Sequence, residues 1–322
     1  MQYKLTIAIP TYNRAGKLKK CVECILPQIK NKPVELLVND NASTDNTESL
    51  MKRMSNKYGF SYYRNHDNVG PDRNFLLGYE RAVGEYVMLL GDDDFLLPGA
   101  IESIMKSLDE NPVMVHINSC DLLKTEPIKK SLPRLKEEGQ IIYHNRDEFF
   151  KGVDIFVTFM SSMILKTDYV QKIKNKEKFI GTYFIQSFIA FEVMKNEGKY
   201  IINTYNCLAA SPNRTVGYDL YFVWGEQYYN LLFNGAINCG IEKSTVEQIY
   251  IKDLKDIILN FVLSFRITCK NSRNWEKKYI LNHVYQYKEV KLAYKWAVNS
   301  PLAVVIIMKI IMLIKRKLNK NI

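Results

Sequence analysis

The stretch YVMLLGDDDFLLPGA, residues 86–100, joins a buried-looking apolar run to three consecutive aspartates. Adjacent carboxylates repel one another, and the apolar neighbours deny Asp92, Asp93 and Asp94 the easy exit of an exposed charged tail. Either a basic side chain or a metal ion must then compensate their charge. An alternative is that the triplet caps the next helix, whose N-terminus attracts negative charge. These explanations predict different functions for the protein.

Strand-like and helix-like segments alternate on both sides of this stretch. The sequence predicts strands at residues 4–9, 34–40, 60–65, 84–92 and 112–120, with helices at 11–29, from a cap at Ser43 or Thr44, at 69–83, and after Pro98 as far as Leu108. This alternation is typical of a mostly parallel sheet covered by helices on both faces. Residues 121–150 are rich in Lys, Glu and Pro and are expected to form a solvated excursion. The chain becomes aromatic and helical in pattern from residue 221 onward.

Composition and charge narrow the class of protein. The chain has 322 residues, of which 47% are hydrophobic and 25% charged, and these values exclude wholesale disorder. The net charge of +11 suits nucleic acid, a membrane surface or phosphorylated substrates. Because the basic residues are spread along the chain without a recognised nucleic-acid-binding motif, a nucleic-acid partner is not expected. Cys21 and Cys24 form a CxxC without further zinc ligands nearby, which favours reduced core thiols and a cytoplasmic location.

Polar loops follow three of the predicted strands. They read PTYNR at 10–14, NDNASTD at 39–45 and GDDD at 91–94. In an open α/β sheet, ligands bind at the carboxyl ends of the strands, so these loops are expected to converge on one crevice. One carboxylate there suits a hard divalent cation, and a second suits a ribose hydroxyl. The guanidinium of Arg73 suits a pyrophosphate.

The chain resembles glycosyltransferase family 2, inverting enzymes of the GT-A fold, in four segments that occur in the family's order and spacing. These are IAIPTYNR at 7–14, LLVNDNASTDNT at 36–47, RNHDNVGPDRN at 64–74 and LLGDDDFLLPGA at 89–100. The resemblance covers residues 3–120. It implies a nucleotide-sugar donor, a divalent cation (Mn²⁺ or Mg²⁺), and transfer of one sugar with inversion at its anomeric carbon.

Positions within these segments imply particular roles. The resemblance implies that the loop along the nucleotide is formed by Pro10, Thr11 and Tyr12, with Arg14 beside it. Asp40 matches the aspartate that recognises the nucleobase, and Arg73 falls near the base or the diphosphate. Asp92 and Asp93 match the ribose-binding and metal-binding carboxylates, and Asp94 is an additional or outer member of the metal site. Many relatives carry Asp-Ala-Asp-Asp where this chain begins with Gly91. That departure leaves the division of labour between Asp92 and Asp93 open.

An inverting transfer also needs a general base for the acceptor hydroxyl. Family members usually supply it from a Glu-Asp pair that opens a helix, but the corresponding stretch here carries Gln186, and glutamine is not a base. The candidates elsewhere are Asp154, Asp168 and Glu192, of which Asp154 is favoured because it precedes an apolar run in the expected acceptor region. Arg214, in SPNRTVGY, is either a phosphate contact or a surface arginine.

The C-terminal segment 301–322 is apolar and then basic. Leu302 to Ile314 is apolar except for Lys309, and this run is shorter than the roughly 20 residues that a spanning helix needs. The basic residues that follow are Lys315, Arg316, Lys317 and Lys320. This pattern favours an amphipathic helix lying on an anionic membrane surface. The alternative is a core helix packed on the preceding domain.

The sequence thus predicts a GT-A domain at 1–220, with a nucleotide-sugar half at 1–120 and an acceptor half at 121–220, followed by a helical extension at 221–300 and the basic tail at 301–322. The predicted activity is metal-dependent transfer from a nucleotide-sugar, by default a UDP-sugar, to a glycan or lipid-linked acceptor of capsule, lipopolysaccharide or teichoic-acid type. The expected location is the inner face of the plasma membrane. The rivals are a catalytically silent scaffold and a sugar nucleotidyltransferase, although the single glycine of PTYNRAGK argues against the latter.

Overall fold

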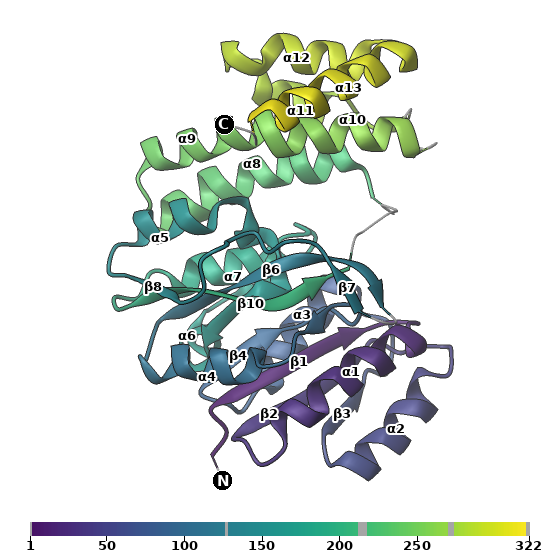
Figure 1. The fold of residues 1–322 in the computed structure, drawn as a ribbon, viewed down its shortest axis with the longest axis vertical. Coiled ribbons are helices and arrows are strands. Elements are labelled where there is room, and N and C mark those ends of the chain that lie inside the picture. The colour runs from purple at the N-terminus through teal and green to yellow at the C-terminus, as the bar shows by residue number, and fades with distance from the viewer. Residues whose placement is uncertain (1, 126–127, 212–217, 270–273, 320–322) are drawn as a thin grey trace. The chain divides into compact units, whose positions relative to one another are not determined.

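The computed structural model describes residues 2–125, 128–211, 218–269 and 274–319. The chain divides into two compact units, Met1–Pro212 and Asn213–Ile322. The first unit contains a large sheet with helices against it, and the second is helical (Figure 1). The division at residue 220 and the separate tail from 301 stay predictions.

Among the described residues, the first unit forms a ten-stranded sheet in the order β3-β2-β1-β4-β9-β6-β10-β5, with β7 paired to β6 and β8 paired to β10. The strands are β1 Leu5–Thr11, β2 Val34–Asp40, β3 Ser61–Arg64, β4 Tyr86–Leu89, β5 Phe95–Leu96, β6 Met114–Thr125, β7 Ile128–Lys130, β8 Gln140–Tyr143, β9 Met163–Lys166 and β10 Tyr200–Ala210. Three of the five strands expected from the sequence, 4–9, 34–40 and 60–65, end within two residues of their predicted ends, whereas 84–92 shortens to β4 and 112–120 extends to Thr125 as β6.

Apart from β9 and three short strands, the strands of the sheet run in one direction. β1, β2, β3 and β4 pair in parallel. β9 then pairs antiparallel with both β4 and β6, so β6 recovers the direction of β4, and β10 pairs in parallel with β6. The shorter strands β5, β7 and β8 run the opposite way. The carboxyl ends of β1, β2 and β4 therefore lie along one edge, as the sequence predicts.

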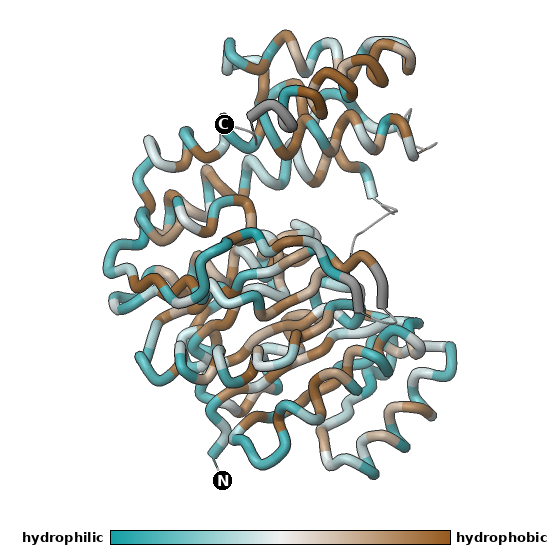
Figure 2. The backbone as a smooth tube through the Cα atoms, viewed as in Figure 1, coloured by the Kyte–Doolittle hydropathy of each residue, from teal (hydrophilic) through white to brown (hydrophobic). Residues whose placement is uncertain are grey.

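Helices cover both faces of the sheet (Figure 1). They are α1 Ala15–Ile29, α2 Thr47–Tyr58, α3 Pro71–Arg81, α4 Ala100–Asp109, α5 Arg146–Val153, α6 Thr167–Lys172 and α7 Ile185–Val193, with 3₁₀ turns η1 Asp154–Thr158, η2 Met160–Ser162 and η3 Lys176–Phe179. Leu18 and Val22 of α1 and Ile104 of α4 pack with alternate strand residues such as Ile7 in one continuous core. α3 lies against β1, β2 and β4 and contacts α6 and α7. The buried strands appear brown, hence hydrophobic, in Figure 2.

The second unit is built from helices throughout its described part. These are α8 Tyr228–Asn230, α9 Lys243–Asp253, α10 Leu259–Thr268, α11 Lys278–Val284, α12 Lys288–Asn299 and α13 Leu302–Asn319, with π-helical turns η4 Phe222–Gln227, η5 Leu231–Ala236 and η7 Leu254–Ile258 and the 3₁₀ turn η6 Ile237–Cys239. Buried tyrosines such as Tyr228, Tyr250 and Tyr294 fill its core. The aromatic, helical character expected from residue 221 onward is confirmed.

Two local expectations are wrong. Neither Ser43 nor Thr44 caps α2, which begins at Thr47 after Asn46. The amide of Thr44 donates to Oδ1 of Asn13, and the hydroxyl of Ser43 accepts the N–H of Asn13. Residues 121–150 are not simply a solvated excursion. Tyr143 pairs antiparallel with Tyr200 through β8, and α5 is ordered behind it.

Candidate functional site

The acidic triplet lies at the carboxyl end of β4 and is not a helix cap. α4 begins at Ala100, eight residues after Asp92, and β5 lies between them in the sequence. No side chain caps α4, whose preceding residue is Gly99 in the left-handed conformation. The helix-cap alternative is therefore wrong, and the charge is compensated by other groups.

Asp92 is held by the last residue of β1 and by a residue of the loop that follows it. Its Oδ2 accepts a hydrogen bond from Oγ1 of Thr11 at 2.8 Å, and its Oδ1 accepts one from Nη1 of Arg14 at 2.9 Å. Asp92 is only 5% exposed, and this burial raises the pKa of its carboxyl group, against the opposing effects of Arg14 and Thr11. The β1 and β4 loops thus meet directly, as the sequence predicts.

Asp93 is the most exposed carboxylate of the triplet, and two cations converge on it. Its Oδ2 lies 3.2 Å from Nη1 of Arg14 and 2.9 Å from Nζ of Lys17. Burial alone lowers the pKa of the Arg14 guanidinium, but Asp92, Asp93 and Asp94 together outweigh it and raise the pKa. Basic side chains therefore compensate Asp92 and Asp93 in this structure.

Asp94 points into the protein. Its Oδ2 accepts a hydrogen bond from Oγ of Ser161 at 2.6 Å, and its Oδ1 accepts one from the backbone N–H of Ser211 at 2.8 Å. The same Ser161 hydroxyl oxygen accepts the N–H of Gly91 at 2.9 Å. Burial raises the pKa of Asp94 to about 7. With both oxygens bonded inside the protein, Asp94 fits the outer role better than that of a direct metal ligand.

The loops after β1 and β2 are tied together by an asparagine in the left-handed conformation. Asn13, at φ 54°, accepts hydrogen bonds at its Oδ1 from the N–H groups of Thr44 (2.7 Å) and Asp45 (3.3 Å). In return, Asp45 accepts the N–H of Ala15 at 3.2 Å, at the start of α1. The second polar loop is thus attached to the first.

Asp40, at the end of β2, is fully buried and does not touch the triplet through any bond of the described residues. Its Oδ1 accepts the N–H of Ser43 at 2.9 Å, and its Oδ2 accepts the hydroxyl of Tyr62 at 2.7 Å. Arg64 lies 3.9 Å from the same Oδ2. The pKa of the Tyr62 hydroxyl is raised, mainly by burial and next by the hydrogen bond to Asp40.

The remaining predicted nucleotide contacts are distributed around this edge. Pro10 is buried within the end of β1, and Tyr12 is 42% exposed just beyond it. Arg73, on α3, pairs with Glu80 at 3.0 Å and Glu177 at 3.5 Å rather than with the triplet.

The candidate bases differ in their surroundings. Asp154 is buried at the start of η1, where its Oδ1 accepts the N–H of Ile155 at 2.8 Å, and its charge acts on the guanidinium of Arg134. Asp168 and Glu192 instead pair with lysines at the surface of their helices. Gln186, in α7, donates to the carbonyl of Thr158 at 2.9 Å, which fixes η1 against α7. Arg214 lies outside the described residues.

Three residues in the region of the site were not predicted from the sequence. Lys17 follows Arg14 by three positions, and this helical spacing was an available signal for it. Ser161 reaches Asp94 from 67 positions away, and no local pattern indicates that contact. Buried Asp72 accepts the N–H of Gly181 at 2.7 Å and so joins α3 to the loop before α7.

The donor chemistry of the residues bears on a metal site. Within the described ranges, no group of three or more His, Cys, Asp or Glu side chains is placed to hold a metal ion. Mg²⁺ is commonly bound through one or two carboxylates plus substrate phosphates, which needs no such group. Asp93, whose side chain is partly exposed, is the carboxylate of the triplet that fits that arrangement.

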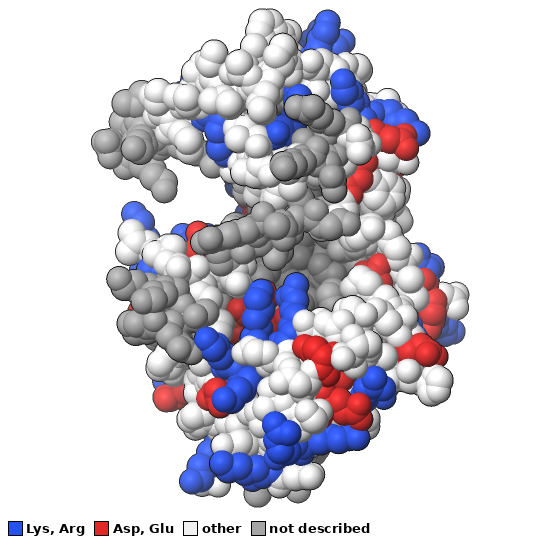
Figure 3. Space-filling view, turned by 90° about the vertical axis from the view of Figure 1, so that its right-hand side faces the viewer, with Lys and Arg blue, Asp and Glu red and all other residues white. Residues whose placement is uncertain are grey.

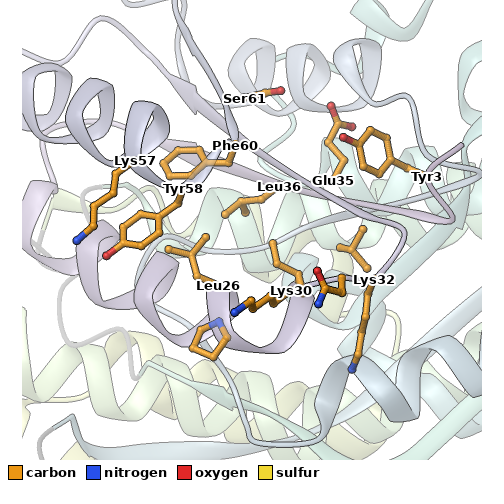
Figure 4. A pocket seen from close by; sticks show the side chains of 15 residues that line it. Tyr3, Leu26, Lys30, Lys32, Glu35, Leu36, Lys57, Tyr58, Phe60 and Ser61 are labelled. Carbon is orange, nitrogen blue, oxygen red and sulfur yellow. The ribbon is translucent and has the colours of Figure 1, made fainter. Parts of the chain in front are cut away.

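A separate hollow of about 650 Å³ lies at the opposite end of the strands (Figure 4). Its lining includes Lys30, Lys57, Tyr58 and Ser61, at the ends of α1 and α2 and the start of β3. None of the predicted donor-site residues lines it. On the face drawn in Figure 3, Lys and Arg side chains form several groups with Asp and Glu between them, so this face carries no single continuous basic patch among its described residues.

The fold and the site together define the class of this protein. The sheet carries carboxylates at the end of its central strand β4, and polar loops lie beside them. The family model for glycosyl transferase family 2 matches residues 6–174, more than half of the chain. The chain belongs to glycosyl transferase family 2. The resemblance that the four sequence segments indicate is thereby confirmed.

Relatives of known name support the same placement. The chain is 31% identical over 206 residues to the abequosyltransferase RfbV of Salmonella typhimurium, covering 60% of this chain and 62% of the relative. It is 35% identical over 109 residues to the GalNAc(5)-diNAcBac-PP-undecaprenol beta-1,3-glucosyltransferase of Campylobacter jejuni, covering 33% of this chain and 35% of the relative. The chain thus matches less than two thirds of the length of either relative.

Solved structures share the fold. TarS 1-349 of S. aureus in complex with UDP superposes with a TM-score of 0.63 at 16% identity, covering 94% of this chain and 89% of that one. The mannosyltransferase PcManGT of Pyrobaculum calidifontis, in complex with GDP-Man and Mn²⁺, superposes with a TM-score of 0.56 at 15% identity, covering 96% and 88%. The predicted fold class, an α/β GT-A sheet with a helical C-terminal extension, is confirmed.

Proposed function

We propose that this protein transfers a sugar, with inversion, from a nucleotide-sugar donor to a glycan or lipid-linked acceptor in the synthesis of a bacterial surface polysaccharide. The observation that carries the proposal is a set of linked side chains where the carboxyl ends of β1 and β4 meet. Its members are Thr11, Arg14, Lys17, Asp92 and Asp93. The proposal is supported by membership of glycosyl transferase family 2. A UDP-sugar is the proposed donor, supported by the similarity to TarS in complex with UDP-GlcNAc.

Residues from different loops have different roles in the proposed donor site. Pro10, Thr11 and Tyr12 lie along the nucleotide, with Arg14 and Arg73 near its phosphates, while Asp92 takes the ribose. Asp40 recognises the base, and for this its carboxylate exchanges the Tyr62 hydroxyl for a base N–H.

Asp93 would hold Mn²⁺ or Mg²⁺, with Asp94 behind it. When bound there, the cation stabilises negative charge on the leaving diphosphate. The buried Asp94 orients the turn through Ser161 and the Ser211 amide, and so keeps Asp93 directed outward. Thr11 and Arg14 fix Asp92 in the same way from the other side.

The proposed base is Asp154, which would take the proton of the acceptor hydroxyl as that oxygen attacks the anomeric carbon. The proposal is supported by the burial of Asp154 in the segment that leads to Ser161, whose hydroxyl bonds to Asp94 of the triplet. Asp154→Asn keeps the shape of the side chain but removes its basicity, so transfer should fall at least about a hundredfold while donor binding is retained. Unchanged transfer by Asp154→Asn would rule this residue out.

A membrane surface is the proposed location, on the cytoplasmic side of the plasma membrane. Among the described residues, no helix is long and apolar enough to cross a bilayer. α13 instead exposes a row of aliphatic side chains, each between 39% and 55% exposed, comprising Leu302, Ile306, Ile307, Ile310, Ile311, Leu313 and Ile314. The name of the Campylobacter relative, which specifies a PP-undecaprenol glycan, supports an acceptor at such a surface.

The single charge within this apolar run does not interrupt the exposed row. Nζ of Lys309 donates to Oγ of Ser264 at 2.6 Å and also contacts Asn260, both on α10. The apolar part of α13 is mostly brown in Figure 2, and Lys315 follows it as an exposed residue. Lys320 lies outside the described residues. An amphipathic helix of this kind binds an anionic lipid surface.

Vesicle binding tests the location. The protein should sediment with vesicles of phosphatidylcholine containing phosphatidylglycerol, and less with phosphatidylcholine alone. Ile307→Glu combined with Ile310→Glu should abolish sedimentation, whereas Leu132→Glu, an 81% exposed aliphatic site in the other unit, should not. Equal sedimentation of both variants would disprove docking through α13.

Titration calorimetry tests the activity class. UDP and the other nucleoside diphosphates are titrated with and without Mn²⁺ into wild type and Asp93→Ala. One diphosphate should bind in a metal-dependent way, and Asp93→Ala should abolish that dependence. Binding of no diphosphate would favour the silent scaffold, for which the neutral Gln186 in α7 is the motivating observation. Preference for a nucleoside triphosphate with a sugar phosphate would favour the nucleotidyltransferase.

A further inference from the structure

Two cations from one end of α1 share a single carboxylate oxygen. Nζ of Lys17 lies 2.9 Å from Oδ2 of Asp93, and Nη1 of Arg14 lies 3.2 Å from the same atom. Arg14 is also bound at 2.9 Å to Asp92. Like charges placed this close repel each other, so the arrangement needs the carboxylates between them.

Lys17 differs from the ordinary surface lysines of the same helix. Lys19 pairs with Glu23 one turn away at 3.7 Å, and both side chains are about half exposed. Lys17 instead reaches a carboxylate 76 positions distant, and the Asp93 side chain is only 18% exposed. The Lys17 side chain is 57% exposed, so more than half of its surface has no packing neighbour. Lys17 is therefore free to change partners, whereas Arg14 is anchored on Asp92.

We propose that Lys17 is a positioning residue that exchanges Asp93 for the donor diphosphate. In the donor-free protein, Lys17 and Arg14 supply two positive charges at the triplet, as many as one divalent cation. When donor binds, Lys17 releases Asp93 to the cation and its Nζ turns to the phosphate oxygens. The proposal rests on the proposed function, because it requires a diphosphate and a cation at this site.

The distances permit this exchange without movement of the helix. A Mg²⁺–oxygen bond is about 2.1 Å long, so a phosphate oxygen that shares the cation with Asp93 lies within about 4 Å of the carboxylate oxygen. Nζ of Lys17 is already 2.9 Å from that oxygen. A compact ammonium group on a flexible stem follows such a shift more readily than a guanidinium bonded to two partners.

The test compares Lys17→Met with Lys19→Met, a matched lysine of α1. Each protein is titrated with Mn²⁺ alone, and with UDP in metal-free buffer. Lys17→Met should bind Mn²⁺ alone about threefold to fivefold more tightly, since a competing ion pair is gone. The same variant should bind metal-free UDP about tenfold more weakly, since one charge-assisted bond is lost. Lys19→Met should match wild type in both titrations.

Thermal unfolding of each variant first establishes that it is folded. If Lys17→Met matches Lys19→Met in either titration, the exchange is overturned while the donor site stands. Failure of the proposed function has a different signature, in which wild type itself binds no diphosphate with or without Mn²⁺. That result overturns both the donor site and the exchange built on it.

Discussion

A side chain on Gly91 would collide with Asp94. A Cβ built on Gly91 lies 2.8 Å from Oδ2 of Asp94, the oxygen that also accepts the Ser161 hydroxyl. The departure from the Asp-Ala-Asp-Asp pattern at this position is therefore coupled to the inward direction of Asp94. An aspartate in place of Gly91 would need the space that the Asp94 carboxylate fills.

The first prediction concerns this shared space. Gly91→Ala should lower the free energy of unfolding by about 1–3 kcal/mol, because the added methyl group overpacks a buried, hydrogen-bonded turn. Gly16→Ala is the control, since nothing lies within 4 Å of a Cβ at Gly16. Urea unfolding of both variants measures the difference. A loss no larger for Gly91→Ala than for Gly16→Ala would show that the turn relaxes freely.

The second prediction concerns the pH dependence of stability. Burial raises the pKa of Asp94 to about 7 in the folded protein, above its unfolded value. The folded state then holds a proton that the unfolded state has lost, so the stability contributed by Asp94 is greatest in acid and is lost as pH rises through about 7. Relative to Asp94→Asn, wild type should lose up to about 4 kcal/mol between pH 4 and pH 7.

Urea unfolding of wild type and Asp94→Asn across this pH range measures the difference between the two curves. Asparagine keeps an oxygen for the Ser211 amide but does not titrate, which isolates the proton. Parallel curves for the two proteins would mean that folding does not raise the pKa of Asp94.

The sequence was sufficient for the parts of the site that depend on local patterns. Residues 34–40 match β2 at both ends, because an apolar run that stops at a polar turn specifies a buried strand. Convergence of the loops after β1 and β4 followed from the direction of parallel strands. The contact of Ser161 with Asp94 depends on how β9 enters the sheet, and no periodicity of the chain encodes that register.

The hydrogen-bond and ion-pair partners of the site residues could not be predicted from the sequence either. The motif around Asp40 predicts a polar site, but burial against the Tyr62 hydroxyl depends on the register between β2 and β3. The sequence indicated that the acidic triplet requires positive charge. It did not indicate that Lys17, a turn further along α1 than the recognised motif, would provide part of it.

The third prediction separates conformation from hydrogen bonding at Asn13. Asn13→Gly keeps the positive φ but removes the acceptor for the Thr44 and Asp45 amides, and should cost about 1 kcal/mol. Asn13→Ala loses the acceptor and also strains the backbone, so it should cost about 1 kcal/mol more. Both variants should weaken UDP binding, because the β2 loop is released. Equal stability of the two variants would show that φ at this position carries no strain.

The fourth prediction uses two lysines of α13 that the structure places differently. Lys309→Met removes the contacts of Nζ with Asn260 and Ser264, and should lower the free energy of unfolding by about 1 kcal/mol while vesicle binding is kept. Lys315→Met should leave stability unchanged, because that side chain is exposed. It should weaken binding to phosphatidylglycerol vesicles by about 1 kcal/mol, the usual effect of one cation near an anionic surface.

Urea unfolding and vesicle sedimentation, applied to both variants, give a crossed pattern if α13 docks as proposed. Lys309 then acts inside the unit and Lys315 acts at the lipid. If Lys309→Met weakens vesicle binding as Lys315→Met does and leaves unfolding unchanged, Lys309 faces the lipid and the helix is rotated about its axis. The exposed row from Leu302 to Ile314 would then not be the membrane-facing side.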